Sequence, residues 1–229
     1  INNDPQNEIL WVPAAAVKKI QKARYAEMVL HEMWCVANLR IKSVEIQGDS
    51  AAVRFHNPES RIQFEHPWPR PMVTKDGHNS AFYLTNAMEL LDEPGEWHHD
   101  IESRKIYYYP RKGEKISKAV VPGIETLVWV EGTIDRPVKH IRFDNVTFQY
   151  TTWMRPSVKG HVPLQAGMYL TDGYRIDPKM KRNYRNHPLD NQGWLGRPAA
   201  AVRVAAAGAI DFEHCHFEHL GSTGVDYEE

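Results

Sequence analysis

Two carboxyl groups near the end of the chain have a spacing that suits acid–base chemistry. Asp226 and Glu228 lie two positions apart, directly after a turn at residues 221–224. On a β-strand, residues two apart share a face, so both carboxyl groups would point the same way. Paired carboxyl groups can act as a general acid and as a base or nucleophile, so these two are our catalytic candidates. The alternative is a solvent-facing strand end, because only a cleft would perturb such groups.

A long polar segment, residues 151–198, combines aromatic rings with charged and amide side chains. A sugar ring can stack its C–H face on an aromatic plane while polar side chains bond its hydroxyl groups. We therefore predict substrate-binding roles for Trp153, Arg155, Tyr174 and Trp194. The alternative is that these aromatic rings anchor a long loop by burying a large area.

A basic cluster lies in the same segment, at Lys179, Lys181, Arg182 and Arg185. It suits an acidic sugar such as a uronic acid, although loop charges of this kind are more often solvated.

Four residues near the second copy of a repeat, described next, resemble zinc ligands in type: His214, Cys215, His216 and His219. The repeat places Cys215 where Val146 stands in the first copy, which is an inward position. The neighbouring histidines would then point elsewhere, and we predict neither a metal nor a cofactor.

The elements that would position these residues are two copies of one strand pattern. The first copy runs through residues 128–130, 141–143 and 146–148, and the second through 202–204, 210–212 and 215–217. Apolar and polar residues alternate, so each strand buries one face only. A unit of this kind cannot cover its own apolar face and has to stack on a copy of itself. We predict coils of a parallel β-helix, with Phe143 and Phe212 in one apolar column.

The rest of the chain is typical of antiparallel β-structure, with a hairpin turn at residues 47–50. We predict an all-β protein in three parts. Residues 1–23 are a strand and short helix leading into the β-helix, 24–117 an inserted antiparallel β-sandwich, and 118–229 the first coils, with 151–198 as a loop excursion.

Composition and charge exclude several classes of protein. The net charge of −1 argues against general nucleic-acid binding, and no apolar run approaches the roughly 20 residues that span a bilayer. Cys35 and Cys215 are the only cysteines, too few for a disulfide framework. The chain begins at Ile1 without a visible signal peptide, and we expect it to be a piece of a longer protein with further coils.

Three blocks of sequence, at residues 82–87, 90–97 and 106–110, resemble right-handed parallel β-helix proteins of the glycoside hydrolase type. The middle block contains the run Asp-Glu-Pro-Gly-Glu-Trp. The similarity is to the families that hold β-xylosidases and α-fucosidase/xylanase-type enzymes. Residues 26–34 resemble the start of the β-sandwich inserted in those families, and residues 208–221 resemble a coil that precedes the active-site coils.

The resemblance implies a bacterial, secreted or periplasmic enzyme that removes sugars from a glycan by a two-carboxylate mechanism. It also implies that the main catalytic pair lies beyond residue 229. The expected partner is an oligo- or polysaccharide. Two alternatives stay open: a polysaccharide lyase on the same fold, suggested by the basic cluster, and a non-catalytic glycan-binding β-helix module.

Overall fold

The computed structural model describes residues 2–66, 71, 80–175 and 194–228. They belong to two compact units. Unit 1 comprises Ile1–Ile116 and Arg155–Gly196, and unit 2 comprises Ser117–Met154 and Arg197–Glu229. The predicted dominance of β-structure is confirmed, with antiparallel pairing in unit 1 and parallel pairing in unit 2. None of the helices in the described part of the chain has the length and apolar character needed to cross a bilayer.

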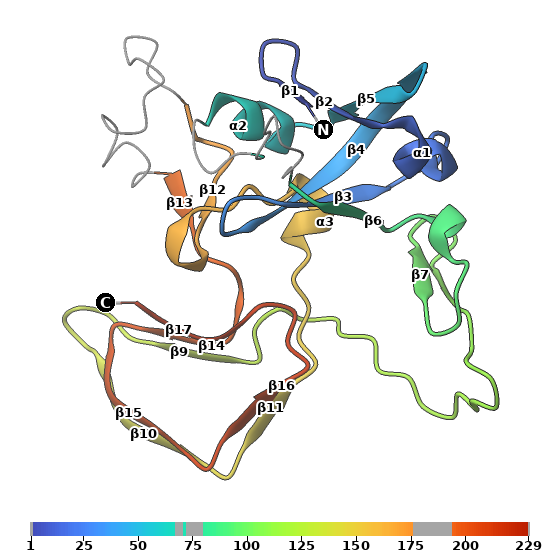
Figure 1. Ribbon diagram of the computed structural model, residues 1–229. Coiled ribbons are helices and arrows are strands. Elements are labelled where there is room, and N and C mark those ends of the chain that lie inside the picture. Colours follow the sequence, from blue (N-terminus) through green and yellow to red (C-terminus); the bar gives the residue numbers. More distant parts are fainter. Residues whose placement is uncertain (1, 67–70, 72–79, 176–193, 229) are drawn as a thin grey trace. The chain divides into compact units, whose positions relative to one another are not determined.

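Unit 1 is built on an antiparallel sheet with the strand order β1-β2-β5-β4-β3-β6 (Figure 1). Its strands are β1 (Asn2–Asp4), β2 (Ile9–Pro13), β3 (Glu27–His31), β4 (Val36–Gln47), β5 (Ser50–Phe55) and β6 (Phe82–Thr85). The predicted hairpin is present, because β4 and β5 pair up to Gln47 and Ser50 around Gly48, whose φ is +60°. Glycine suits that turn because a residue without Cβ adopts positive φ at no steric cost.

The long strand β4 pairs with both of its neighbours in the six-stranded sheet, and the β-sandwich expected for residues 24–117 stays a prediction. Its first half, up to Arg40, pairs with β3, and its second half, from Ile41, pairs with β5. The register shifts between Ile41 and Ser43. A bulge bends a strand, so β4 can pair with β3 along one half and with β5 along the other.

Short helices cover parts of this sheet. They are α1 (Ala14–Val17), α2 (Glu59–Glu65), α3 (Arg155–Lys159) and the 3-10 turns η1 (Lys18–Ile20), η2 (Met88–Leu90) and η3 (Gln165–Gly167). Helix α2 buries Ile62 and Phe64, and the Phe64 ring stacks on Phe55 of β5. The core of unit 1 gathers apolar residues of the sheet and helices, with Met28, Leu30, Leu39 and Val53 at most 1% exposed.

The predicted boundaries differ from the structure in two places. Residues 9–13, expected to lead into the β-helix, form β2 and pair with β5 inside unit 1. Most of the expected excursion at residues 151–198 also belongs to unit 1. The reason is backbone pairing and burial: Asn38 and His161 exchange two backbone hydrogen bonds, and Leu170 is completely buried in the core. This segment adds the strands β12 (Tyr169–Leu170) and β13 (Leu195–Gly196), which pair with each other.

A separate hairpin in unit 1 is formed by β7 (Trp97–Asp100) and β8 (Lys105–Tyr108). The turn between them is fixed by Asp100, which accepts hydrogen bonds from the Ser103 hydroxyl and from the backbone N–H groups of Glu102 and Ser103. A short carboxylate that bonds the backbone ahead of it is typical of tight turns.

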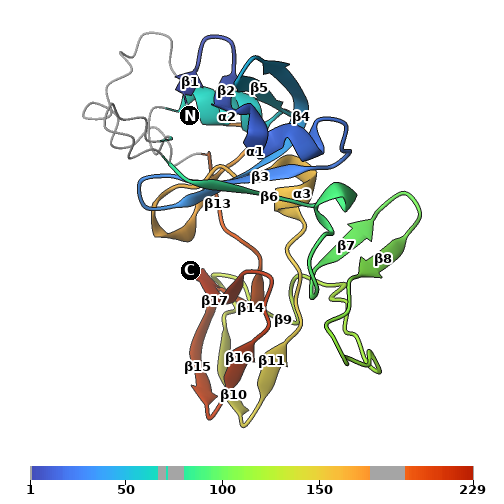
Figure 2. The same ribbon diagram turned by 45° about the vertical axis from the view of Figure 1, so that its right-hand side comes forward.

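Unit 2 consists of two turns of chain whose strands pair in parallel, one turn on the other (Figures 1 and 2). The strands of the first turn are β9 (Val128–Glu131), β10 (Val138–Asp144) and β11 (Thr147–Gln149). Those of the second are β14 (Ala200–Ala205), β15 (Ala207–Glu213) and β16 (His216–Glu218). The next strand, β17 (Thr223–Glu228), pairs with the other side of β14.

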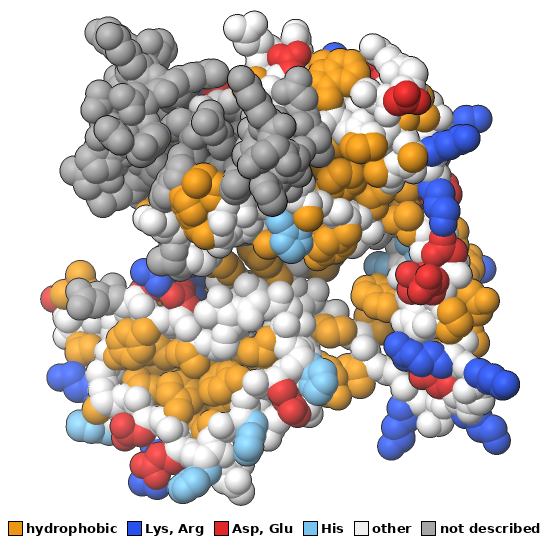
Figure 3. Space-filling model, viewed as in Figure 1, with side chains coloured by type: hydrophobic (Ala, Val, Ile, Leu, Met, Phe, Trp, Pro, Cys, Tyr) orange, Lys and Arg blue, Asp and Glu red, His pale blue; other side chains and the backbone are white. Residues whose placement is uncertain are grey.

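The interior of unit 2 is the apolar column that the sequence predicts. Phe143 lies opposite Phe212 in the β10–β15 ladder, and Phe148 lies opposite Phe217 in the β11–β16 ladder. Val202 and Val204 are fully buried beside them. Figure 3 shows hydrophobic side chains gathered between the ladders, with charged and histidine side chains toward the rim.

The corners of the two turns also repeat. Asn145 and His214 both have positive φ, 59° and 51°, at the bend that follows the second strand of each turn. Cys215 and Val146 both pack against the apolar core, which confirms the inward position predicted for the cysteine.

Candidate functional site

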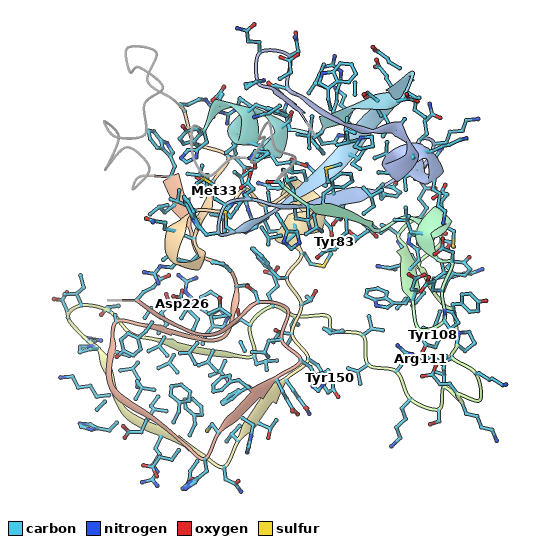
Figure 4. The ribbon with its side chains drawn as sticks, viewed as in Figure 1. Met33, Tyr83, Tyr108, Arg111, Tyr150 and Asp226 are labelled. Carbon is cyan, nitrogen blue, oxygen red and sulfur yellow. The ribbon has the colours of Figure 1, made fainter. Side chains whose placement is uncertain are left out.

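The outer face of the sheet β17-β14-β9 carries a row of functional side chains. Arg203 of β14 lies opposite Trp129 on one neighbouring strand and Asp226 on the other. The adjacent positions Val202 and Val204 are fully buried. Because side chains alternate between the faces of a strand, Trp129, Arg203 and Asp226 point away from the interior. Figure 4 shows Asp226 on that outer side of β17.

Two arginines hold the two predicted carboxylates. Arg197 Nη1 lies 2.5 Å from Asp226 Oδ1, and Arg197 Nε lies 3.7 Å from Glu228 Oε1. Arg203 Nη2 donates to Glu228 Oε2 at 3.0 Å. We call these four residues the arginine–carboxylate cluster. The Asp226 side chain is only 13% exposed, so its bond to Arg197 is better shielded from solvent than an ordinary surface pair.

Trp129 extends the cluster along the row. The guanidinium carbon of Arg203 lies 4.8 Å from the centre of the Trp129 ring, within the range of a cation–π contact. The Trp129 side chain is 56% exposed, so much of the ring is open to solvent. The indole, the two guanidinium groups and the two carboxylates together offer an apolar plane and several hydrogen-bonding groups on one face.

Sequence reasoning placed Asp226 and Glu228 on one strand face, but it missed Trp129, Arg197 and Arg203. A signal was present for two of these. Trp129 and Arg203 are the central residues of equivalent strands in the repeat, each between inward valines. Arg197 lies outside any strand, and only the folded chain brings it to the carboxylates.

The chemistry open to the cluster follows from its charges. The carboxylate oxygens can accept hydrogen bonds from sugar hydroxyl groups, and the guanidinium groups can donate to them. The cluster therefore combines hydrogen-bond donors and acceptors on one face of the sheet.

The predicted sugar-binding residues fall in different units. Trp153 belongs to unit 2 and is half-buried. The backbone of Thr152 and Trp153 lies against Gly221, where an added Cβ would come within 2.4 Å of the Thr152 carbonyl carbon. Gly221 is thus needed for the close approach of two chain segments. Arg155, Tyr174 and Trp194 belong to unit 1.

Arg155 connects two other residues of unit 1 through its guanidinium group. It donates to Asp172 Oδ1 at 3.0 Å, and its guanidinium carbon lies 4.1 Å from the centre of the Tyr169 ring. Lys159 also donates to Asp172, at 2.7 Å. Partial burial would raise the pKa of Asp172, but the hydrogen bonds from Lys159 and Arg155 outweigh it and the pKa is lowered.

Tyr174 and Trp194 pack together in unit 1. Their rings meet edge to face with centroids 5.8 Å apart, and Tyr174 is 3% exposed. His66 meets the same tyrosine ring at 5.2 Å. In this arrangement the Tyr174 ring stabilises the core, which agrees with the anchoring alternative, while a sugar-binding role for the four residues stays a prediction. The basic cluster at residues 179–185 lies outside the described residues.

Unit 1 also buries the carboxyl groups of Glu27, Glu32 and Glu59, which the sequence did not single out. Glu59 is 1% exposed and makes a two-pronged ion pair with Arg40, with N···O distances of 2.7 and 2.9 Å. Glu32 is 8% exposed and accepts a hydrogen bond from the Gln63 amide at 2.5 Å. Burial raises the pKa of Glu32 to about 7, although hydrogen bonds from Gln63 and Cys35 oppose the shift.

Among the described residues of unit 2, three possible metal ligands lie close together at the surface. Oxygen and nitrogen atoms of Asp144, Glu213 and His214 lie within 4.8 Å of one another. Arg142 forms ion pairs with both carboxylates and so supplies the positive charge between them. Together with the contact of His214 with Asp144, these pairs form an ion-pair network on the surface.

Comparisons with known proteins agree with the two units. Residues 1–111 match the family model described as "GH141 insertion domain", which covers most of the first segment of unit 1. The chain is also similar, with 73% identity and a TM-score of 0.89, to a solved structure named "Glycoside hydrolase". That match covers 99% of this chain and 39% of the other, so the chain spans well under half the length of its relative. None of the curated proteins matches the chain.

Proposed function

We propose that this chain is part of a glycoside hydrolase that removes sugars from a glycan with two carboxyl groups. The observation that carries the proposal is the 73% identity, over 99% of the chain, to a protein named glycoside hydrolase. The match of residues 1–111 to the GH141 insertion domain supports the same function. We further propose a secreted or periplasmic location, where polymeric glycans are accessible.

The parallel ladders of unit 2 support the finer structural part of this proposal. Each strand of the first turn lies on its equivalent in the second, and β17 begins the next layer on β14. We interpret these layers as coils of a right-handed parallel β-helix, since crossovers between parallel strands are right-handed in nearly all proteins. The chain would then share a β-helix with an inserted antiparallel domain with enzymes of the β-xylosidase and α-fucosidase/xylanase types.

The role of the arginine–carboxylate cluster follows from its charges. Asp226 and Glu228 are both engaged by arginines, and a two-carboxylate mechanism also needs a group that donates a proton to the leaving oxygen. We propose that this partner lies outside residues 1–229. Trp129 and the arginines would then bind the sugar next to the reacting bond.

The test is an assay of the full-length protein on nitrophenyl xylosides, fucosides and arabinosides and on oligosaccharides. Release of nitrophenol or of a monosaccharide is expected from at least one substrate. A protein that is folded by circular dichroism yet releases nothing from the whole panel would contradict the proposal.

One observation favours a second candidate, a non-catalytic glycan-binding module. Both carboxylates are already engaged by arginines, as they would be in a surface that only binds hydroxyl groups. Thermal stabilisation by a glycan without turnover would favour this module. A lyase is distinguished in the same assay, because it releases unsaturated products that absorb ultraviolet light.

A further inference from the structure

The turn between β3 and β4 places a buried carboxyl group beside a thiol. The turn is closed by the Glu32 backbone N–H, which donates to the Cys35 carbonyl oxygen at 2.9 Å. Met33, labelled in Figure 4, is 50% exposed in this turn, whereas Glu32 is only 8% exposed. Cys35 Sγ lies 3.6 Å from Glu32 Oε2. The turn therefore brings a possible oxygen ligand and a possible sulfur ligand to one place.

Helix α2 adds a third polar group at the same carboxyl. The Gln63 amide donates from Nε2 to Glu32 Oε1 at 2.5 Å, and Gln63 is 4% exposed. Its other amide atom, Oε1, is buried and has no hydrogen-bond partner in the described part of the chain. A buried oxygen without a partner is costly, so this position favours the presence of a donor or a cation.

Glu32 also lacks the cation that a buried carboxylate usually has. Glu59, which is buried to a similar degree, pairs with Arg40 through two N···O contacts. Among the described residues, the partners of the Glu32 side chain are Gln63 and Cys35, and neither is a cation. A buried carboxyl group keeps its proton, pairs with a cation or coordinates a metal. For Glu32, the proton and the metal are the two choices left.

The separation of the sulfur and oxygen atoms suits a single metal ion. In a tetrahedral zinc site, sulfur lies about 2.3 Å and oxygen about 2.0 Å from the metal, so the two ligand atoms are about 3.5 Å apart. The distance of 3.6 Å between Cys35 Sγ and Glu32 Oε2 agrees with this value. Mg²⁺ and Ca²⁺ prefer oxygen ligands, whereas a thiolate selects zinc. Cys35 is partly exposed, so water can supply a further ligand.

We propose that Glu32, Cys35 and Gln63 form a binding site for a thiophilic divalent cation such as Zn²⁺. Glu32 supplies a carboxylate oxygen and Cys35 a thiolate. Gln63 supplies Oε1 once its amide turns about the last side-chain bond, which exchanges its oxygen and nitrogen. The Cys35 thiol proton passes to solvent as the metal–sulfur bond forms. In the metal-free protein, Glu32 keeps a proton instead. Because the site exists only in the folded chain, the ion stabilises unit 1.

The experiment is a titration of the EDTA-treated full-length protein with Co²⁺, followed by the charge-transfer absorption of cobalt bound to a thiolate. We expect this absorption to saturate, and Zn²⁺ to displace the cobalt. Loss of an outer-shell partner costs about 10–100-fold in metal affinity, so removal of a ligand in Glu32→Gln or Cys35→Ser should weaken binding by about a hundredfold or more.

The chain offers two matched controls. Cys215→Ser removes the other partly exposed cysteine, which packs in unit 2. His214→Ala disrupts the surface group that His214 forms with Asp144 and Glu213. Neither variant should change the cobalt–thiolate absorption.

A second measurement needs no variant. Alkylation of Cys35 in the native protein is followed by mass spectrometry of its peptide, with Cys215 as the internal reference. We expect Zn²⁺ to slow the alkylation of Cys35 by about tenfold or more, because a metal-bound thiolate is no longer free to react, and EDTA to restore the rate.

Several outcomes would overturn the inference. They are the absence of cobalt–thiolate absorption, its persistence in Cys35→Ser, unchanged affinity in Glu32→Gln, and alkylation of Cys35 at the same rate with and without Zn²⁺. Neither measurement involves a glycan or turnover. The inference can therefore fail while the proposed glycoside hydrolase function holds, and the reverse is equally possible.

Discussion

The rings of Phe143 and Phe212 lie face to face, with centroids 5.1 Å apart and planes inclined by 15°. They come from consecutive turns of unit 2 and occupy paired positions in a parallel ladder. Phe148 and Phe217 repeat the arrangement one strand later, at 4.8 Å. The four rings form a continuous apolar column that joins the two turns, so each turn stabilises the other.

Truncating one ring of this column should destabilise unit 2. We expect Phe212→Ala to lower the free energy of unfolding by about 2–3 kcal/mol, toward the low end for buried aromatics because the ring is partly exposed. Urea unfolding of Phe143→Ala, Phe212→Ala and the double variant should show a coupling of about 0.5–1.5 kcal/mol. Lys139→Ala, at an exposed position of β10, is the control and should change little. Strictly additive losses would show that the rings do not interact.

The buried ion pair between Arg40 and Glu59 should be sensitive to the loss of one partner. Removing the guanidinium in Arg40→Ala leaves the Glu59 carboxylate, 1% exposed, without its partner, and we expect a loss of about 3–5 kcal/mol. Thermal or urea unfolding of Arg40→Ala and of the native protein measures this loss in the free energy of unfolding. The exposed ion pair of Arg24 with Glu102 offers the comparison, and Arg24→Ala should cost less than about 1 kcal/mol. Similar losses for the two variants would contradict this account.

Gly160 should be needed for the same ion pair. Its φ is +66°, and an added Cβ would lie 2.4 Å from Glu59 Cγ. We expect Gly160→Ala to destabilise unit 1 by at least about 1 kcal/mol, because the backbone strain and the clash both act on the folded state. Gly48→Ala has a similar positive φ but open space around its Cβ, so it isolates the strain alone. Equal losses in the two variants would mean that the contact with Glu59 contributes nothing.

Glu32 should make the protein less stable as the pH rises through the range between about 4.5 and 7. Its pKa is about 7 in the folded chain and has the ordinary value of 4.5 when unfolded, so the folded state binds the proton more tightly within that window. The free energy of unfolding falls by about 3 kcal/mol at most, and the fall is complete above the pKa of the folded chain. Glu32→Gln should therefore be more stable than the native protein at pH 8 and no more stable at pH 4.

Urea unfolding of both proteins across this pH range measures the difference. Cys35, the neighbouring titratable group, does not interfere, because burial raises the pKa of its thiol to about 12. Glu45→Gln, at an exposed position of β4, is the matched control and should leave the pH profile unchanged. If the free energy of unfolding of Glu32→Gln depended on pH in the same way as that of the native protein, the raised pKa of Glu32 would be refuted.

Asp226 should matter for activity more than an exposed carboxylate elsewhere in unit 2. In the full-length protein we expect Asp226→Asn to reduce kcat/KM by at least about a hundredfold if the carboxylate is a base or nucleophile. Glu218→Gln, on the outer side of β16, should have no effect. A variant that raises KM and leaves kcat unchanged would assign Asp226 to sugar binding alone.

Repeated local patterns in the sequence were enough to predict the parallel pairing of unit 2. The alternation around Phe143 and Phe212, and the inward position of Cys215, depend only on neighbours along one strand. The hairpin around Gly48 was predictable for the same reason, since turn and flanking strands are contiguous. The boundary of the excursion at residues 151–198 could not be predicted in this way, because the pairing of Asn38 with His161 joins residues far apart in the chain.

For the candidate site, the sequence alone determined that Asp226 and Glu228 share a strand face, because side chains alternate along every strand. It did not determine which side chains meet them. Arg197 and Arg203 reach the carboxylates only because β14 and β17 pair in one particular register, and Trp129 joins the row through the opposite edge of β14. Register between distant strands is set by the packing of the whole unit, which no single segment encodes.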